Sequence, residues 1–206
     1  MPSPNAPPED PAEQAAALPE RRVHLVLLGP HTRVVATLCV ACPTGPAGCC
    51  AAPPGLSWAD IGRIAALGGA AWVVAEMRAG RLRRGPRGLI IERVDPAGDG
   101  AKKCVYHADG SGCFVPPDRR SAACNYYVCG DALEEGGGEV VAAEAACRAW
   151  TAQYATWDEI LSAEVRGWGG TAETDEAEEG LFTRLGERFR ELSGWRAAAS
   201  GEKLRP

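Results

Sequence analysis

The chain has 206 residues, nine cysteines and a formal net charge of −5. This length is enough to bury a hydrophobic core, so the cysteines are not needed merely to stabilise a small domain. The negative charge disfavours a broad nucleic-acid-binding surface, and the best apolar run, 68–75, is too short to cross a membrane. Residues 1–10 have neither the basic start nor the apolar run of a signal peptide, and we therefore expect a cytoplasmic protein.

The first forty residues contain two contrasting patterns. Residues 1–20 are rich in Pro, Ala and Glu and have little apolar surface to bury, so we expect a disordered leader whose removal leaves the fold intact. The stretches 22–28 and 32–40 favour β-structure, and Gly29 and Pro30 lie between them. This pattern predicts a β-hairpin that leads directly into the first cysteines.

Eight of the nine cysteines fall into two groups of four. The first group spans 39–50, where prolines and glycines set tight turns and a Cys-x-x-Cys pair can supply two thiolates to one ion. The second group spans 104–129, a stretch of turn-forming residues with little capacity for a core of its own. We therefore predict loops stapled by metal, with the candidate ligands Cys39, Cys42, Cys49, Cys50, Cys104, Cys113, Cys124 and Cys129.

The region between the two groups contains helix and strand signals. Ser57, followed three residues later by Asp60, is typical of a capping box and predicts the start of a helix. A second apolar face follows at 72–77. The basic stretch 78–87 has five arginines and no aromatic residue, so we interpret it as a solvated linker between two halves rather than an anion-binding loop. Residues 89–94 predict a strand.

The remainder of the chain is helical in character. Apolar residues at helical spacing predict one long helix with the stripe Val140, Cys147, Trp150, Tyr154, Trp157 and Leu161. Free cysteine is among the most buried residue types, so we expect Cys147 to be a core residue and not a ligand. A last helix is predicted to start near Thr174, with acidic residues in its first turns and arginines later, as the helix dipole favours.

These elements predict an α+β fold, a mainly helical single domain with a short β-hairpin and metal-stapled cysteine loops. The expected organisation is a disordered leader at 1–20, a cysteine-cluster metal-binding domain at 21–135, a helical pair packed on it at 136–196, and a loose tail at 197–206.

The two cysteine groups, with the Leu-Ser-Trp-Ala-Asp-Ile helix start between them and Arg120 ahead of Cys124 and Cys129, invite comparison with a known family. Over about 39–129 the chain resembles the YkgJ-type cysteine-cluster family, described as zinc- or iron-chelating domains. The resemblance implies metal binding by the eight thiols. Flagellin lysine N-methylases carry a similar cluster, which implies an alternative function in an enzyme.

The sequence leaves the metal arrangement open. Eight thiols allow two four-thiolate sites or one such site with a redox-active remainder, and we favour sites shared between the two groups over independent ones. A tetrahedron of sulfurs suits both zinc and an iron-sulfur cluster. His107 could replace one thiolate, although a hydrogen bond to the cluster or surface exposure is the simpler role. Basic residues could compensate the thiolate charge or be ordinary surface charges, namely Lys102, Lys103, Arg119 and Arg120.

Three functional hypotheses follow. The favoured one is a structural or accessory metal-binding protein whose partner is the metal ion and whose thiolate site organises the fold and presents a surface to a protein partner. The second is an iron-sulfur metalloenzyme that modifies a protein substrate, as the flagellin methylases imply. The third is a disulfide framework. No P-loop, H-E-x-x-H, G-x-S-x-G or dinucleotide-binding motif adds a catalytic prediction.

Overall fold

The fold is known from a computed structural model, which describes residues 23–26, 33–36, 48–95, 98, 102–108, 112–134, 139–169 and 174–195. The predicted leader at 1–20, the predicted tail at 197–206, and the candidate ligands Cys39 and Cys42 lie outside these residues.

Helices make up most of the described structure, and the strands form short antiparallel pairs, as the α+β prediction requires. The strands are β1 (Val23–Val26), β2 (Arg33–Ala36), β3 (Leu82–Gly85), β4 (Gly88–Ile91), β5 (Arg93–Val94), β6 (Lys103–Cys104), β7 (His107–Ala108) and β8 (Gly112–Cys113). The α-helices are α2 (Trp58–Ala66), α3 (Ala70–Arg78), α4 (Ala122–Tyr126), α5 (Gly130–Glu134), α6 (Val140–Gly167) and α7 (Asp175–Ser193). Two 3-10 helices are η4 (Cys49–Ala51) and η5 (Pro117–Arg119).

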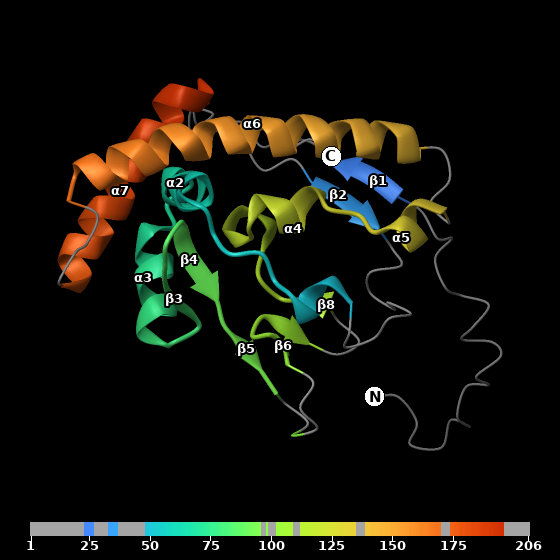
Figure 1. Cartoon of the computed structure of the whole chain (residues 1–206), viewed down its shortest axis with the longest axis horizontal. Coiled ribbons are helices and arrows are strands. Elements are labelled where there is room, and N and C mark those ends of the chain that lie inside the picture. Colours follow the sequence, from blue (N-terminus) through green and yellow to red (C-terminus); the bar gives the residue numbers. More distant parts are fainter. Residues whose placement is uncertain are drawn as a thin grey trace, which may run out of the picture.

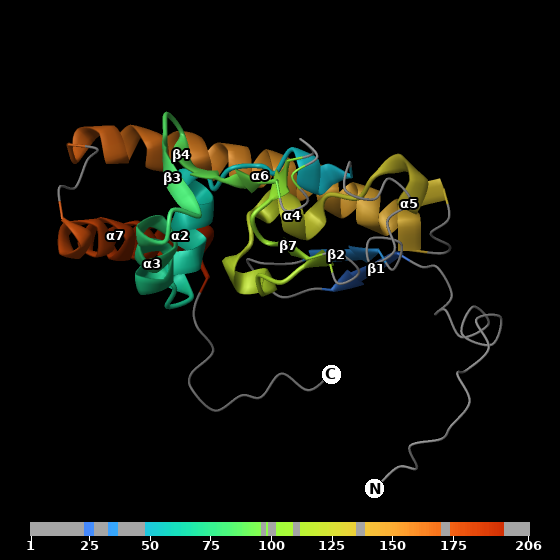
Figure 2. The same ribbon diagram turned by 90° about the horizontal axis from the view of Figure 1, so that it is seen from below.

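The long helix α6 runs along one side of the molecule, and most of the other elements lie below it in the view of Figure 1. It packs on α2 and α7 along one part of its length and on α4 and β1 along another. Figure 2 shows α7 lying beside α2 and α3 when the molecule is seen from below. None of the described helices is long and apolar enough to cross a membrane.

The predicted hairpin is present near the N-terminus. Strands β1 and β2 pair antiparallel, with Val23 opposite Ala36 and Val26 opposite Arg33. Val23 is buried and belongs to the core beneath α6. The strands are shorter than the predicted stretches, and residues 37–47, which follow β2, lie outside the described residues.

Helix α2 is the centre of the core, and its start was predicted correctly. The Ser57 side chain accepts a hydrogen bond from the Asp60 backbone N–H, and the Asp60 carboxylate accepts one from the Ser57 backbone N–H, which completes the capping box. All nine residues of α2 are buried. This helix is therefore enclosed by its neighbours.

Helices α2 and α7 approach closely because glycines lie at their contact. A Cβ atom at Gly186 would come within 2.7 Å of the Ala66 backbone nitrogen, and one at Gly62 would come within 3.1 Å of the Leu185 carbonyl oxygen. The absence of side chains at both positions lets the two backbones meet. Around this crossing, the fully buried side chains include Ile61, Ile64, Leu161, Phe182, Leu185 and Phe189.

The stripe predicted for α6 supplies aromatic rings to the same core. The Trp157 ring lies edge-to-face with Phe189 at a centroid distance of 5.1 Å and with Tyr154 at 5.2 Å. Cys147 packs against this core but is only half-buried, whereas the sequence predicted a buried position. Helix α7 begins after the N-cap Thr174, as predicted, and ends before Gly194, which adopts φ 64°.

The interpretation of the basic stretch 78–87 as a solvated linker is wrong. Part of it forms strand β3, which pairs with β4 in a tight hairpin. Four of its five arginines form ion pairs: Arg78 with Asp175, Arg81 with Glu76, Arg83 with Glu92, and Arg84 with Glu178. Two of these acids lie in the first turn of α7, so the charges join the hairpin and α3 to the C-terminal helix.

The predicted strand 89–94 is also divided. Residues 88–91 pair with β3, whereas Arg93 and Val94 turn to pair with β6, with Arg93 opposite Cys104. The break falls at Glu92, whose backbone N–H donates to the Arg81 carbonyl oxygen. This change of partner connects the hydrophobic core to the cysteine-bearing segment.

Two glycine substitutions on α7 test the close helix contact. We expect Gly186→Ala to destabilise the protein by about 1–3 kcal/mol, because the added methyl group meets the α2 backbone. Gly180→Ala on the same helix has open space around its Cβ position and should stabilise the protein by up to about 1 kcal/mol. Urea unfolding followed by circular dichroism measures both. Equal effects of the two substitutions would contradict the described packing.

Candidate metal centre

The candidate site is positioned by a buried carboxylate on α2. Asp60 caps its own helix and also reaches the distant start of α4, where its Oδ1 accepts a hydrogen bond of 2.7 Å from the Ala122 backbone N–H. The Ser121 hydroxyl donates to its other oxygen at 3.3 Å. Burial raises the pKa of Asp60, and the charge of Arg63 together with hydrogen bonds from Ala122 and Ser57 opposes that shift. One side chain thereby fixes the starts of two helices.

Arg63, a buried arginine one helical turn after Asp60, binds the same distant segment. Arg63 is fully buried, and its Nη2 lies 3.9 Å from Asp60 Oδ1. It donates to the carbonyl oxygen of Asp118 at 3.1 Å and to that of Arg120. Burial raises the pKa of Tyr154 on α6, and the positive charge of Arg63 opposes this shift. Asp60 and Arg63 thus bind segment 118–122 through both its N–H groups and its carbonyl groups.

Two further arginines bind backbone carbonyls of the same region. Arg120 donates to the carbonyl oxygens of Val115 at 2.5 Å and Cys113 at 2.9 Å, which closes the chain between β8 and α4. Arg119 donates to the Ile64 and Leu67 carbonyl oxygens at 3.3 Å, at the end of α2. These contacts show structural roles for two of the four cations that were considered for charge compensation. Of the other two, Lys103 is buried and Lys102 is exposed.

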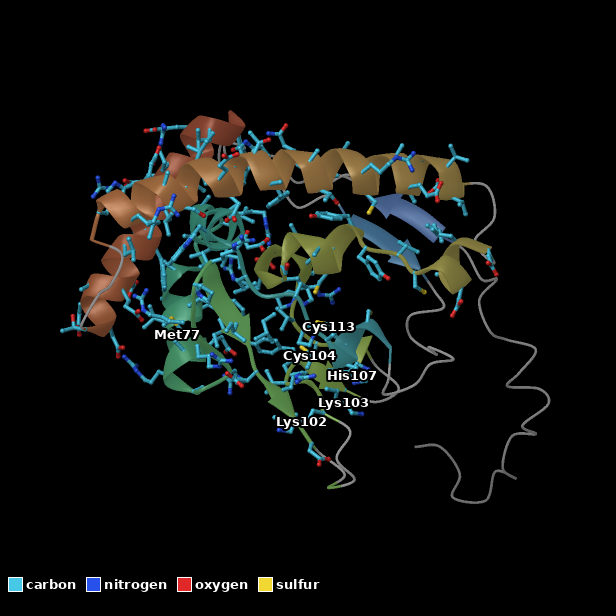
Figure 3. The ribbon with its side chains drawn as sticks, viewed as in Figure 1. Met77, Lys102, Lys103, Cys104, His107 and Cys113 are labelled. Carbon is cyan, nitrogen blue, oxygen red and sulfur yellow. The ribbon has the colours of Figure 1, made fainter. Side chains whose placement is uncertain are left out.

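This scaffold carries thiols from four separate segments. Cys49 and Cys50 lie on η4, which packs against β6. Arg93 on β5 donates to the Ala51 carbonyl oxygen at 3.0 Å, and the same residue pairs with Cys104 across the β5–β6 ladder. Figure 3 shows Cys104 and Cys113 in the same region of the molecule. The thiol-bearing segments are η4, β6, β8 and α4.

The thiols are close enough to affect one another's ionisation. A hydrogen bond from Cys50 lowers the pKa of Cys49 to about 6, and the same interaction raises the pKa of Cys50. The charges of Cys104 and Cys113 raise the pKa of Cys50 further. Desolvation raises the pKa of Cys124 to about 12, with smaller contributions from Cys113, Cys104 and Cys49. Five candidate ligands therefore share one electrostatic neighbourhood.

The other described candidates differ in their placement. Cys129 is half-buried just before α5, where its carbonyl oxygen accepts from the Leu133 N–H. His107 lies opposite Cys113 in the β7–β8 pair, so the two side chains are cross-strand neighbours. All seven described cysteines are free thiols.

The described thiols do not form a finished coordination site. Within the described segments, no three His, Cys, Asp or Glu side chains are arranged so that they could hold a metal ion. Cys39 and Cys42, which were predicted to contribute a pair of ligands from one turn, lie outside those segments. The structure therefore places soft sulfur donors, of the kind that zinc and iron-sulfur clusters prefer, within electrostatic reach of one another, without showing a metal geometry.

Sequence reasoning missed three features near the thiol-bearing segments. Asp60 was predicted to cap its own helix only, and Arg63 was not singled out. A surface cleft of about 440 Å³ was also missed; its lining includes Trp72, Tyr106 and Phe114. The proximity of Tyr106 to Cys104 and of Phe114 to Cys113 in the sequence was the available signal, because aromatic residues in a core-poor segment need a surface to pack against.

Comparisons with family models, with curated proteins and with solved structures each found no match for the chain. The class of protein is therefore defined here by the fold and the site alone: an α+β chain that brings free thiols together beside a helical core.

Arg63→Met tests whether the buried guanidinium holds the thiol-bearing region. We expect destabilisation of about 3–5 kcal/mol, because Asp60 is left without its buried counter-charge and two carbonyl groups lose their donor. Hydrogen exchange should accelerate most in 117–126. Arg148→Met, at an exposed position on α6, is the matched control and should change stability by less than about 0.5 kcal/mol. A similarly small effect at Arg63 would contradict this role.

Proposed function

We propose that the protein binds zinc or an iron-sulfur cluster through thiolates drawn from its two cysteine groups and serves a structural or accessory role. The observation that carries this proposal is the gathering of Cys49, Cys50, Cys104, Cys113 and Cys124, all free, from segments up to 75 residues apart in the sequence. Cys39, Cys42 and Cys129 complete the proposed ligand set.

The chemistry of these donors supports a soft metal. Thiolates are the ligands of structural zinc and of iron-sulfur clusters, whereas magnesium and calcium prefer oxygen. Cys49 and Cys50 already share a hydrogen bond, and a metal ion would replace the proton between neighbouring sulfurs with a stronger interaction. Arg93 lies opposite Cys104 and donates to the Ala51 carbonyl oxygen next to Cys50, so it adds positive charge on this side of the thiol-bearing segments.

The secondary structure of this region also supports a stabilising metal. Strands β6, β7 and β8 have two residues each, and α4 has five, so local structure contributes little to their stability. Binding of a metal by thiolates from several segments would supply folding free energy where the hydrophobic core is thin. The resemblance to the YkgJ-type family supports the same proposal, and a protein partner at the metal-organised surface is part of it.

Metal analysis of the purified protein tests this function. We expect zinc or iron at a defined stoichiometry by mass spectrometry, together with reduced cysteines in a thiol count under denaturing conditions. A colourless zinc protein agrees with the structural role. A brown protein that loses its visible absorption in air agrees with metal binding but favours the iron-sulfur enzyme alternative. Absence of metal after anaerobic preparation, with oxidised cysteines, would overturn the proposal.

Single cysteine substitutions identify the ligands. Cys39→Ser and Cys124→Ser should each lower the metal content by at least half and accelerate hydrogen exchange in 102–134, because each removes a donor from the site. Cys147→Ser, on α6 and outside the thiol group, should keep full metal content and is the control. If both Cys39→Ser and Cys124→Ser keep full occupancy, the proposed ligand set is wrong.

A further inference from the structure

A cleft beside the thiol-bearing turns has the composition of a small-molecule site. It has a volume of about 440 Å³, and its apolar lining comes from Trp72 on α3 and from the segment that follows Cys104 and Cys113. Volumes of roughly 300–1,000 Å³ are typical of ligand pockets. The apolar lining residues are Trp72, Tyr106, Phe114, Val115 and Pro116.

Three aromatic rings form the walls of this cleft. The Tyr106 ring is buried and is a neighbour of the other two, with centroid distances of 6.4 Å to Trp72 and 5.8 Å to Phe114. The Phe114 ring stands nearly perpendicular to it, at 80°, and is 61% exposed. An exposed aromatic side chain at the edge of an aromatic-lined cleft offers a face on which a planar ligand can stack.

The polar end of the cleft is formed by the ion pair of Glu76 and Arg81, in which the carboxylate is buried and the guanidinium is partly exposed. Glu76 is 7% exposed, and its two oxygens accept from Arg81 at 2.5 and 2.7 Å and from the Tyr106 hydroxyl at 2.7 Å. The Arg81 side chain is 42% exposed. A guanidinium has five N–H donors, and Glu76 takes only some of them. The carboxylate is therefore covered, and the group that a ligand meets is the cation.

We propose that this cleft binds a small planar aromatic molecule that carries a carboxylate or another anionic acceptor group. The ring stacks between Trp72 and Phe114 over Tyr106, and the anionic group accepts hydrogen bonds from the outer N–H groups of Arg81. An aromatic cation fits less well, because Arg81 repels it and the oxygens of Glu76 are already engaged. The geometry thus favours a ligand that has an aromatic ring and a negative charge.

This site goes beyond metal binding and does not depend on it. All of its lining residues belong to the described structure, and Arg81, Glu76 and Trp72 come from α3 and the turn after it. Metal content and ligand binding can therefore be measured separately on the same sample, and either can fail without the other.

Four probes of similar chemistry test the ligand class on the full chain: benzoate, benzyl alcohol, benzylammonium and acetate. Isothermal titration or ligand-observed NMR should show benzoate binding about tenfold tighter than benzyl alcohol, with benzylammonium and acetate weaker still. Acetate tests whether a carboxylate alone, for example on a bound metal, explains the signal. Equal binding of benzoate and acetate, or tightest binding of benzylammonium, would overturn the proposal.

Substitutions then test which residues contact the aromatic ring of the ligand and which residue binds its anionic group. Phe114→Ala should weaken benzoate binding by about three- to tenfold and leave the fold intact, because the ring is largely exposed. Tyr127→Ala removes another exposed aromatic ring outside the cleft and should leave binding unchanged. Arg81→Gln should abolish the preference for benzoate over benzylammonium, since it uncovers Glu76. Retention of that preference would show that Arg81 is not the anion-binding group.

Discussion

The structure depends on a buried carboxylate and guanidinium that project from the same central helix. Asp60 and Arg63 satisfy both kinds of backbone group in segment 118–122: the carboxylate accepts from the N–H at the start of α4, and the guanidinium donates to the carbonyls before it. Buried polar backbone groups cost several kcal/mol when they lack partners. A loop with few apolar residues can lie against an apolar helix only because these two side chains meet its hydrogen-bonding needs.

Two parts of the molecule are therefore stabilised by different physics. Around α2, α6 and α7 the side chains are apolar, and helices meet at glycines with aromatic rings packed edge-to-face. In the cysteine-bearing part, arginine side chains bind backbone carbonyls, and very short strands provide the rest. The second part has little apolar surface to bury, and this is the part in which the proposed metal would contribute most.

The proposed metal centre and the aromatic cleft share two short turns. Tyr106 follows Cys104 by two residues, and Phe114 directly follows Cys113. Any change in the position of these thiols would move two walls of the cleft. Binding at one site can therefore modulate binding at the other, although neither site needs the other to be occupied, and any such coupling is reciprocal.

The sequence by itself determined the local features. The capping box of Ser57 and Asp60, the stripe of α6 and the N-cap Thr174 of α7 all depend on residues three or four positions apart, where helix geometry fixes which groups meet. The cysteine spacing likewise identified the candidate ligands, and their roles remain predictions that the metal measurements address.

Only the tertiary structure decided which distant groups become partners. Arg78 pairs with an aspartate 97 residues away, and Asp60 caps a helix 62 residues away. The stretch 78–87 was therefore interpreted as a solvated linker from the sequence, although α7 supplies acidic partners for two of its arginines. Such pairings depend on how helices pack on one another, which local periodicity does not encode, and the same packing places an aromatic cleft beside the thiols.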